Sequence, residues 1–184
     1  MSSKKSIHDA RIAISGKSGC GNTTVSRLIS NILDLRFINY TFRNLAQEKG
    51  LSFEQILDLA KEDDSLDKEV DKHQVELARK DGGCVLGSRL AIWMLPEADL
   101  KVYLSAKLDV RVKRIQNREG GTLDDIIKST KKRDKQDRER YLKIYNIDND
   151  NYSFADIVIQ TDETKPAEIA EMIISELKKK IAAT

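Results

Sequence analysis

The sequence predicts an α/β protein in three layers, with a five-stranded parallel sheet flanked by helices. Short apolar, β-branched runs alternate along the chain with segments of helical spacing, which is typical of right-handed βαβ units. A glycine-rich segment directly follows the first apolar run, and parallel sheets bind ligands at the carboxyl ends of their strands. The 184 residues suit one domain with a sizeable core, and no repeat or linker divides them.

Five apolar runs are predicted to be strands, and the first of them leads into the glycines. These runs are Arg11–Ser15, Phe37–Tyr40, Cys84–Leu86, Lys101–Leu104 and Ile157–Ile159. Helical spacing is found over Thr23–Leu33, Thr41–Lys49, Ser52–Leu59, Asp67–Arg79, Leu108–Arg118, Leu123–Tyr145 and from Pro166 toward Ile181. Gly50 and Gly120 are predicted to end two of these helices, because glycine readily adopts the left-handed conformation of a helix terminus.

Charge and cysteine usage exclude several classes of protein. The chain has 32 Lys and Arg against 30 Asp and Glu, a net charge of +2, whereas proteins that coat nucleic acid carry a larger basic excess. Cys20 and Cys84 have no zinc-site spacing, which predicts reduced thiols in a cytoplasmic protein. Met1–Lys5 is basic, but no apolar stretch follows it before Arg11, so we expect neither a signal peptide nor a membrane partner.

Residues Gly16–Thr24 fit the P-loop motif G-x-x-x-x-G-K-[ST] with one departure. Its glycines let backbone N–H groups turn toward a phosphate, and the following helix adds its dipole. Thr23 occupies the position whose hydroxyl ligates Mg²⁺. The predicted ATP-binding residues are Gly16, Lys17, Ser18, Gly19, Cys20, Gly21, Asn22, Thr23 and Thr24.

The departure is Asn22, which stands where the motif has a lysine that bridges the terminal phosphates. Losing a preorganised cation from a phosphoryl-transfer site costs roughly 10²–10³ in rate, if oxyanion-hole deletions are a guide. Lys17 lies next to the first glycine and is a candidate substitute. A solvent-facing Lys17 with no catalytic role is the alternative.

Arginines gather where a phosphotransferase needs them, because phosphoryl transfer depends mainly on positioning and positive charge. Arg43 and Arg89 follow the second and third predicted strands, at the ligand edge of the sheet. Arg111, Arg114 and Arg118 recur on the helix after the fourth strand, and Arg133, Asp137 and Arg140 share one face of the next helix at i, i+4 and i+7. The basic run Lys128–Arg140 alternates with acidic residues, which argues against a nucleic-acid partner.

The sequence resembles the cytidylate kinases, and in particular the short, archaeal-type branch of the nucleoside monophosphate kinases. The resemblance extends from Arg11 to about Leu177. It is carried by Ile14–Gly16 with Thr23–Val25, Phe42–Ala46, Asp67–Arg79, Val85–Leu86, Ser88–Leu90, Trp93–Met94, Arg118–Gly120, Arg133–Tyr141 and Tyr145–Asp148.

The resemblance implies the nucleoside monophosphate kinase fold and transfer of the ATP γ-phosphate to CMP or dCMP with Mg²⁺. It implies a single kinase domain over residues 1–184, with an acceptor-binding helical region at about 41–80 and a lid at about 115–133. We expect a monomer. By position, the acceptor-binding residues are Arg43, Arg89, Arg133, Asp137 and Arg140, and the catalytic residues are Arg114, Arg118, Arg133 and Lys17. Closure of the lid excludes water, which otherwise competes as acceptor.

Two positions depart from this family's pattern, and they leave other functions open. Asn22 replaces the P-loop lysine, and Gly87 stands where the branch usually has a carboxylate after the third strand. Because the two lost charges cancel, the pair is either a compensated change or the mark of a silent nucleotide-binding regulator. A kinase for another small acceptor, such as UMP or AMP, is a further alternative.

Overall fold

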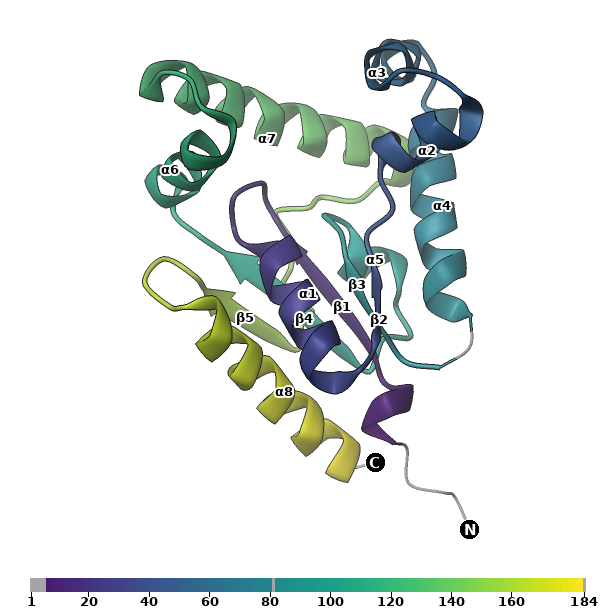
Figure 1. Cartoon of the computed structure of the whole chain (residues 1–184), viewed down its shortest axis with the longest axis vertical. Helices are drawn as coiled ribbons and strands as arrows, with labels where there is room; N and C mark the ends of the chain where they lie inside the picture. The colour runs from purple at the N-terminus through teal and green to yellow at the C-terminus, as the bar shows by residue number, and fades with distance from the viewer. Residues whose placement is uncertain (1–5, 81, 184) are drawn as a thin grey trace.

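The computed structural model describes residues 6–80 and 82–183, which form one five-stranded parallel sheet in the order β2-β3-β1-β4-β5 (Figure 1). The segment Met1–Lys5, on which the expectation about a signal peptide rests, lies outside the described residues. The strands are β1 (Arg11–Gly16), β2 (Arg36–Ile38), β3 (Cys84–Gly87), β4 (Leu100–Ser105) and β5 (Ile157–Gln160). The three-layer α/β fold expected from the sequence is thereby confirmed.

β1 is the central strand and is buried on both faces. Ile12 pairs with Val85 of β3 on one side and with Leu100 of β4 on the other. Because side chains alternate along a strand, Ile12 and Ile14 enter one core while Ala13 enters the other. This explains why the sequence of β1 is a continuous apolar run and not an alternating one.

Helices cover both faces of the sheet. α1 (Asn22–Leu33) and α8 (Pro166–Ala183) pack on one face, and α4 (Ser65–Arg79) and the short α5 (Ala91–Met94) pack on the other. The remaining helices are η1 (Ile7–Asp9, a 3₁₀ turn), α2 (Phe42–Lys49), α3 (Phe53–Glu62), α6 (Leu108–Glu119) and α7 (Leu123–Tyr145). The predicted helices are all present with boundaries shifted by a few residues, whereas η1 and α5 were not predicted.

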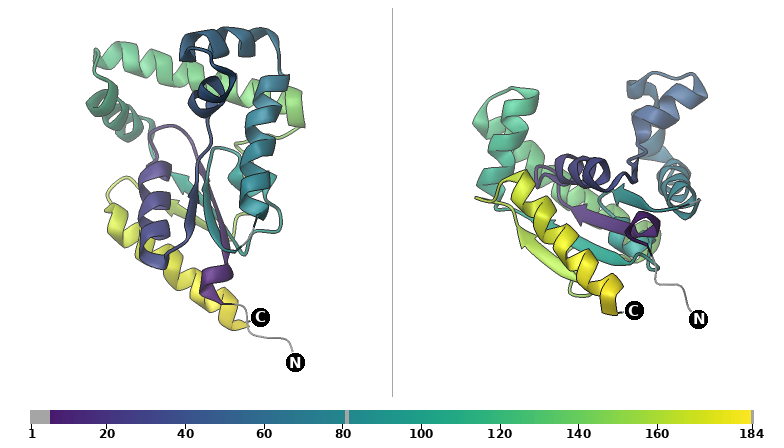
Figure 2. Two further views of the ribbon diagram at one scale, coloured as in Figure 1. Left: turned by 45° about the vertical axis from the view of Figure 1, so that its right-hand side comes forward. Right: turned by 60° about the horizontal axis from the view of Figure 1, so that its bottom comes forward.

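Two helical arms rise beyond the carboxyl edge of the sheet. α2 and α3 form one arm above α4, and α6 and α7 form the other (Figure 2). α7 crosses the edge of the sheet from α6 toward α4, where the Tyr145 hydroxyl donates to Asp71 at 2.7 Å (Figure 1). The space between the arms lies directly over the glycine loop. No helix among residues 6–80 and 82–183 is long and apolar enough to cross a membrane.

Candidate active site

The glycine loop connects β1 to α1 and has no room for side chains at two of its positions. Gly19 has a φ of +84°, and a Cβ there would lie 2.8 Å from the carbonyl oxygen of Arg111. A Cβ at Gly16 would overlap the Cys20 thiol and the carbonyl oxygen of Leu104. α1 begins at Asn22, so its unpaired N–H groups lie at the end of the loop, as in a phosphate site.

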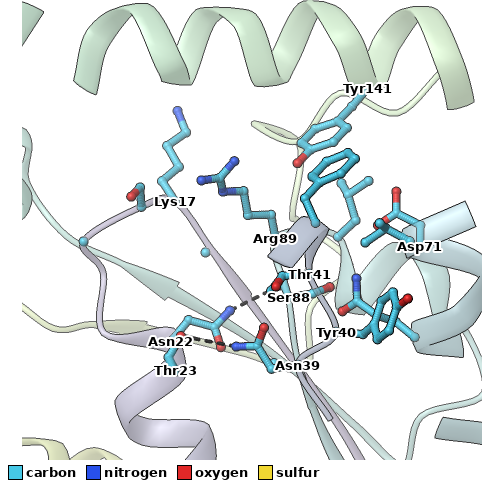
Figure 3. A pocket seen from close by; sticks show the side chains of 18 of the residues that line it. Lys17, Asn22, Thr23, Asn39, Tyr40, Thr41, Asp71, Ser88, Arg89 and Tyr141 are labelled. Atoms are coloured by element: carbon cyan, nitrogen blue, oxygen red, sulfur yellow. Dashed lines mark hydrogen bonds between the residues drawn. The ribbon is translucent and has the colours of Figure 1, made fainter. Parts of the chain in front are cut away.

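Asn22 is paired within the protein at each polar atom of its side chain. Its Nδ2 donates to the carbonyl oxygen of Ser88 at 3.2 Å (Figure 3) and to that of Ile14 at 2.9 Å. Its Oδ1 accepts from Ser26 Oγ at 2.9 Å. The amide therefore ties the carboxyl ends of β1 and β3 together. The sequence placed Asn22 among the ATP-binding residues, but in the structure its side chain is engaged by the sheet.

Gly87, the second departure, lies against the first. A Cβ on Gly87 would lie 2.7 Å from Ser26 Oγ and 3.1 Å from Asn22 Oδ1. The space that a side chain at 87 would need is thus filled by the hydrogen bond between Ser26 and Asn22. The two departures, which are 65 positions apart in the chain (87 − 22), form one packed unit.

Lys17 and Thr23 line a cavity of about 390 Å³ above this unit. The Lys17 Nζ lies 2.6 Å from Asp150 Oδ1, in the segment between α7 and β5, and its side chain is 30% exposed. In Figure 3 Lys17 extends toward α7, on the same side of the cavity as Arg89. The Thr23 hydroxyl accepts from Asn39 Nδ2 in a long contact of 3.4 Å, so it remains accessible as a ligand.

Arg89 and Arg140, two of the predicted acceptor-binding residues, meet on Asp137 at the cavity wall. Arg89 donates to Asp137 Oδ2 at 2.6 Å, and Arg140 donates to Asp137 Oδ1 at 3.1 Å. Burial alone would lower the pKa of Arg89, but the negative Asp137 and the nearby Tyr141 raise it above its ordinary value. Arg89, whose side chain is 36% exposed, therefore stays positively charged at the cavity wall, as binding a phosphate requires.

Three polar residues of α4 also line the cavity, although the sequence analysis gave them no role. Asp67, Asp71 and Gln74 lie at i, i+4 and i+7, on one face of the helix. Burial raises the pKa of Asp71 to about 6, which the hydrogen bond from Tyr145 partly offsets. The sequence signal was the presence of Asp67 and Gln74 at helical positions otherwise occupied by buried apolar residues.

The arginines of α6 fall into two groups. Arg111 is buried, pairs with Asp134 at 2.6 Å and donates to the carbonyl oxygen of Ser18, so it joins both helices to the glycine loop. Arg114 donates to the hydroxyl of Thr161 at 3.0 Å and to its carbonyl oxygen. Arg118 contacts only its neighbour Glu119 among the described residues and lies between two cavities.

The second cavity, of about 320 Å³, lies beside the glycine loop and opens on the opposite side from α4. Its walls include the loop itself, α6 and the start of α8, and the residues that line both cavities are Gly19, Gly21, Thr24 and Arg118. Cys20 is fully buried here, and burial raises the pKa of its thiol. Both Cys20 and Cys84 are free thiols, as expected from the sequence.

The other two predicted acceptor-binding arginines, Arg133 and Arg43, do not line the first cavity. Arg133 of α7 reaches the glycine loop, where it donates to Ser18 Oγ at 3.4 Å. Arg43 is exposed on α2, with its guanidinium 4.0 Å from the centre of the Phe53 ring, and it does not line either cavity. An acceptor-binding role for Arg43 would require α2 to move toward the glycine loop.

A parallel sheet with a phosphate loop after its first strand, and with arginine-bearing helices over that loop, defines a P-loop kinase. The model of the cytidylate kinase-like family matches residues 11–163, and the chain belongs to that family. This confirms the resemblance carried by the glycine loop and the arginine motifs.

Curated relatives match over nearly the whole chain. A protein named cytidylate kinase 2 from Borreliella afzelii (strain PKo) is 46% identical over 174 residues, which are 92% of this chain and 97% of the relative. A protein named cytidylate kinase from the archaeon Methanobrevibacter smithii is 39% identical over 169 residues, which are 91% of this chain and 98% of the relative. The family assignment therefore covers the two arms as well as the glycine loop.

Solved structures of other kinases share the fold at low sequence identity. Shikimate kinase from Acinetobacter baumannii, in complex with shikimate, superposes with a TM-score of 0.64 at 18% identity, over 92% of this chain and 93% of the other. Deoxyadenosine kinase from M. mycoides with bound dATP gives a TM-score of 0.57 at 17% identity, over 91% of this chain and 99% of the other. At these identities the likeness concerns the fold alone.

Proposed function

We propose that this chain transfers the γ-phosphoryl group of ATP to CMP or dCMP. The observation that carries the proposal is the cavity that joins the glycine loop, at one end, to Arg89, Arg140 and the polar face of α4 at the other. A phosphoryl acceptor bound there would place its phosphate beside the loop that holds the donor. The names of the curated relatives favour CMP over UMP or AMP as the acceptor, and a kinase over a silent regulator.

The two cavities suit the two substrates. The second cavity would take the base and ribose of ATP, because the phosphates could then run along the loop N–H groups into the first cavity. Arg114, which is held by Thr161 and therefore fixed in place, would form a wall of the ATP site. The region 41–80, which contains α2, α3 and α4, would bind the acceptor, and residues 115–133 at the turn between α6 and α7 would close as a lid.

Thr23 is the residue that would hold Mg²⁺. Its hydroxyl lines the first cavity and has a single long contact to Asn39, so an oxygen ligand is available at the first turn of α1. Mg²⁺ usually keeps several waters and binds substrate phosphates with only one or two protein ligands, so one hydroxyl fits the requirement. The ion would neutralise phosphate charge during transfer.

The cations of the site would stabilise the charge that develops on the transferred group. Lys17 is the proposed substitute for the lysine that Asn22 replaces, because it lines the cavity and its amine forms a partly exposed ion pair with Asp150. Arg118 lies between the two cavities with no partner except Glu119 among the described residues, so it is free to turn toward the phosphates. Arg133 would act beside it from α7.

Asp137 would hold the arginines of the acceptor site in position and would not contact the base of the acceptor. Both of its oxygens accept from arginines that line the cavity, so it holds Arg89 and Arg140 in the positions where they meet the acceptor phosphate or sugar. Removing it would take the ion-pair partner from Arg89 and would leave Arg140 with Asp67 alone.

The test is a coupled ADP-release assay with ATP and Mg²⁺ and with CMP, dCMP, UMP and AMP as separate acceptors. The expected result is turnover of about 1 s⁻¹ or more on CMP, at the low end of ordinary enzymes. ATP without an acceptor should be hydrolysed far more slowly, because lid closure excludes water. Nucleotide binding without turnover on any acceptor would refute the kinase and support the silent regulator.

A further inference from the structure

Four buried side-chain atoms among the described residues have no hydrogen-bond partner, and three of them belong to residues that line the first cavity. These three are Asp67 Oδ2, Gln74 Oε1 and Arg140 Nε; the fourth, Asn149 Oδ1, lies elsewhere. Buried polar atoms are almost always paired in folded proteins, because each unpaired one costs the full desolvation of the group. Three such atoms at one cavity indicate a ligand that completes their hydrogen bonds.

The two acceptors of this set come from one face of α4. Asp67 and Gln74 are each only 5% exposed and lie seven positions apart, which is two helical turns. Both residues line the first cavity from the same face of α4. In Figure 3 Asp71, which lies between them on α4, faces the cavity across from Arg89 and Tyr141.

The donor comes from the opposite wall. Arg140 of α7 places its Nε 3.2 Å from Asp67 Oδ1, an ion pair whose geometry leaves the Nε–H without a hydrogen bond. A ring bound between α4 and α7 would therefore meet two acceptors and one donor. The carboxylate of Asp137, on the same wall, already accepts a hydrogen bond from an arginine at each oxygen.

Two acceptors and one donor are complementary to the hydrogen-bonding edge of cytosine and not to that of uracil. Cytosine carries an amino group at C4, which donates, next to N3, which accepts. Uracil has a carbonyl oxygen at C4 and an N–H at N3, so both signs are reversed. Against Asp67 and Gln74, the O4 atom of uracil would face two oxygen atoms, and an oxygen without a donor is left unsatisfied in a buried site.

We infer that Asp67 and Gln74 select cytosine over uracil by accepting from the 4-amino group of the acceptor base, while Arg140 donates to its N3 edge. The inference rests on the proposed function, since it concerns the base of the same acceptor. In this arrangement α4 recognises the base of the acceptor, and Arg89 binds the phosphate of the acceptor.

The experiment compares kcat/KM for CMP and for UMP in the original protein, Gln74→Met and Asp67→Asn. Gln74→Met keeps the length of the side chain but removes the acceptor, so we expect the CMP-to-UMP ratio to fall about tenfold or more, the effect of one good base contact. Asp67→Asn adds an N–H donor that can meet O4 of uracil, so kcat/KM for UMP should rise while that for CMP falls. Gln160→Met, at an exposed position of β5 that lines neither cavity, is the control and should leave the ratio unchanged.

The ratio of kcat/KM for CMP to kcat/KM for UMP distinguishes a loss of base recognition from a loss of folded protein. A variant that only weakens the fold lowers both activities by the same factor, so an equal loss on CMP and UMP in Gln74→Met and Asp67→Asn would overturn the inference. An unchanged ratio would overturn it as well, and would mean that water alone satisfies these atoms. The midpoint of thermal unfolding of Gln74→Met should be maintained or raised, because an unpaired buried acceptor is removed.

Binding measurements keep this inference distinct from the kinase proposal. If the protein turns over no acceptor, calorimetric Kd values for CMP and UMP still test the role of α4. Tighter binding of CMP that is lost in Gln74→Met would support it, and equal binding of CMP and UMP by the original protein would refute it. Turnover with UMP preferred over CMP would establish a kinase and refute the base selection.

Discussion

Two parts of the first cavity differ in how their polar groups are hydrogen-bonded: the floor, formed by Asn22 and Gly87, and the α4 wall, formed by Asp67, Asp71 and Gln74. On the floor, each polar atom of the Asn22 amide is paired with β1, β3 or α1. On the wall, Asp67 and Gln74 each keep a buried oxygen with no partner. A polar residue in a P-loop motif can therefore have a structural role. A polar residue on a helix that carries no motif can be the better candidate for contact with the substrate.

The largest effect on kcat is expected at Lys17, because this lysine lines the cavity and is the proposed substitute cation. Lys17→Ala should lower kcat by about 10²–10³, the usual cost of removing one preorganised charge-stabilising group. The midpoint of thermal unfolding should change little, because exposed ion pairs contribute little stability. Lys61→Ala is the matched control: Lys61 pairs with Asp58 at the same 2.6 Å, but on the exposed surface of α3. Equal kcat in Lys17→Ala and the original protein would show that Lys17 is not the substitute cation.

Asn22→Lys tests the floor directly, because it restores the motif while it removes the paired amide. The carbonyl oxygens of Ile14 and Ser88 lose their donor, so the free energy of unfolding should fall by roughly 2–3 kcal/mol. Urea denaturation measures the loss. The control is Asn31→Lys on the exposed side of α1, which should be nearly neutral. A more stable Asn22→Lys protein would contradict the structural role of Asn22.

Gly87→Ala should destabilise the protein by about 1–3 kcal/mol, because the added Cβ lies too close to Ser26 Oγ and Asn22 Oδ1. Combined with Ser26→Ala, which removes the nearest atom, the cost should be smaller than the sum of the two single changes. Denaturation of the four proteins in this cycle measures the coupling. Strictly additive losses would mean that Asn22, Ser26 and Gly87 do not act as one unit.

Asp71 gives the smallest expected effect, and it depends on pH. Its pKa in the folded protein is about 6, above its ordinary value of 3.8, so the folded state binds more protons than the unfolded state between these values. Stability should therefore fall as pH rises from about 4 to about 6, by roughly 1 kcal/mol after allowance for partial solvent exposure.

Asp71→Asn should remove this fall, which unfolding curves at several pH values would measure. Asp58→Asn, on the exposed surface of α3, should keep the pH dependence of the original protein. If Asp71→Asn and the original protein lose stability in parallel between pH 4 and pH 6, a group other than Asp71 is responsible.

The glycine loop and the sheet could be predicted because their signals are local. Gly16, Gly19 and Gly21 are spaced within six residues, and a β-branched run comes directly before them, so the motif needs no knowledge of the rest of the fold. The short helix α5 was missed because Ala91–Met94 is too short for a helical period to be recognised. The resemblance assigned Arg43 to the acceptor; in the structure its guanidinium lies over the Phe53 ring, and the role stays a prediction.

The fold class, the position of the phosphate loop and the family of the chain could all be predicted from the residues alone. Which polar groups are already hydrogen-bonded became visible only in the folded chain. Asn22 and Ser88 are 66 positions apart, and Arg89 and Asp137 are 48 apart, so these pairings exist only after the sheet and α7 have assembled. A motif is set by neighbours along the chain, whereas the pairing of a buried polar atom is set by neighbours in space.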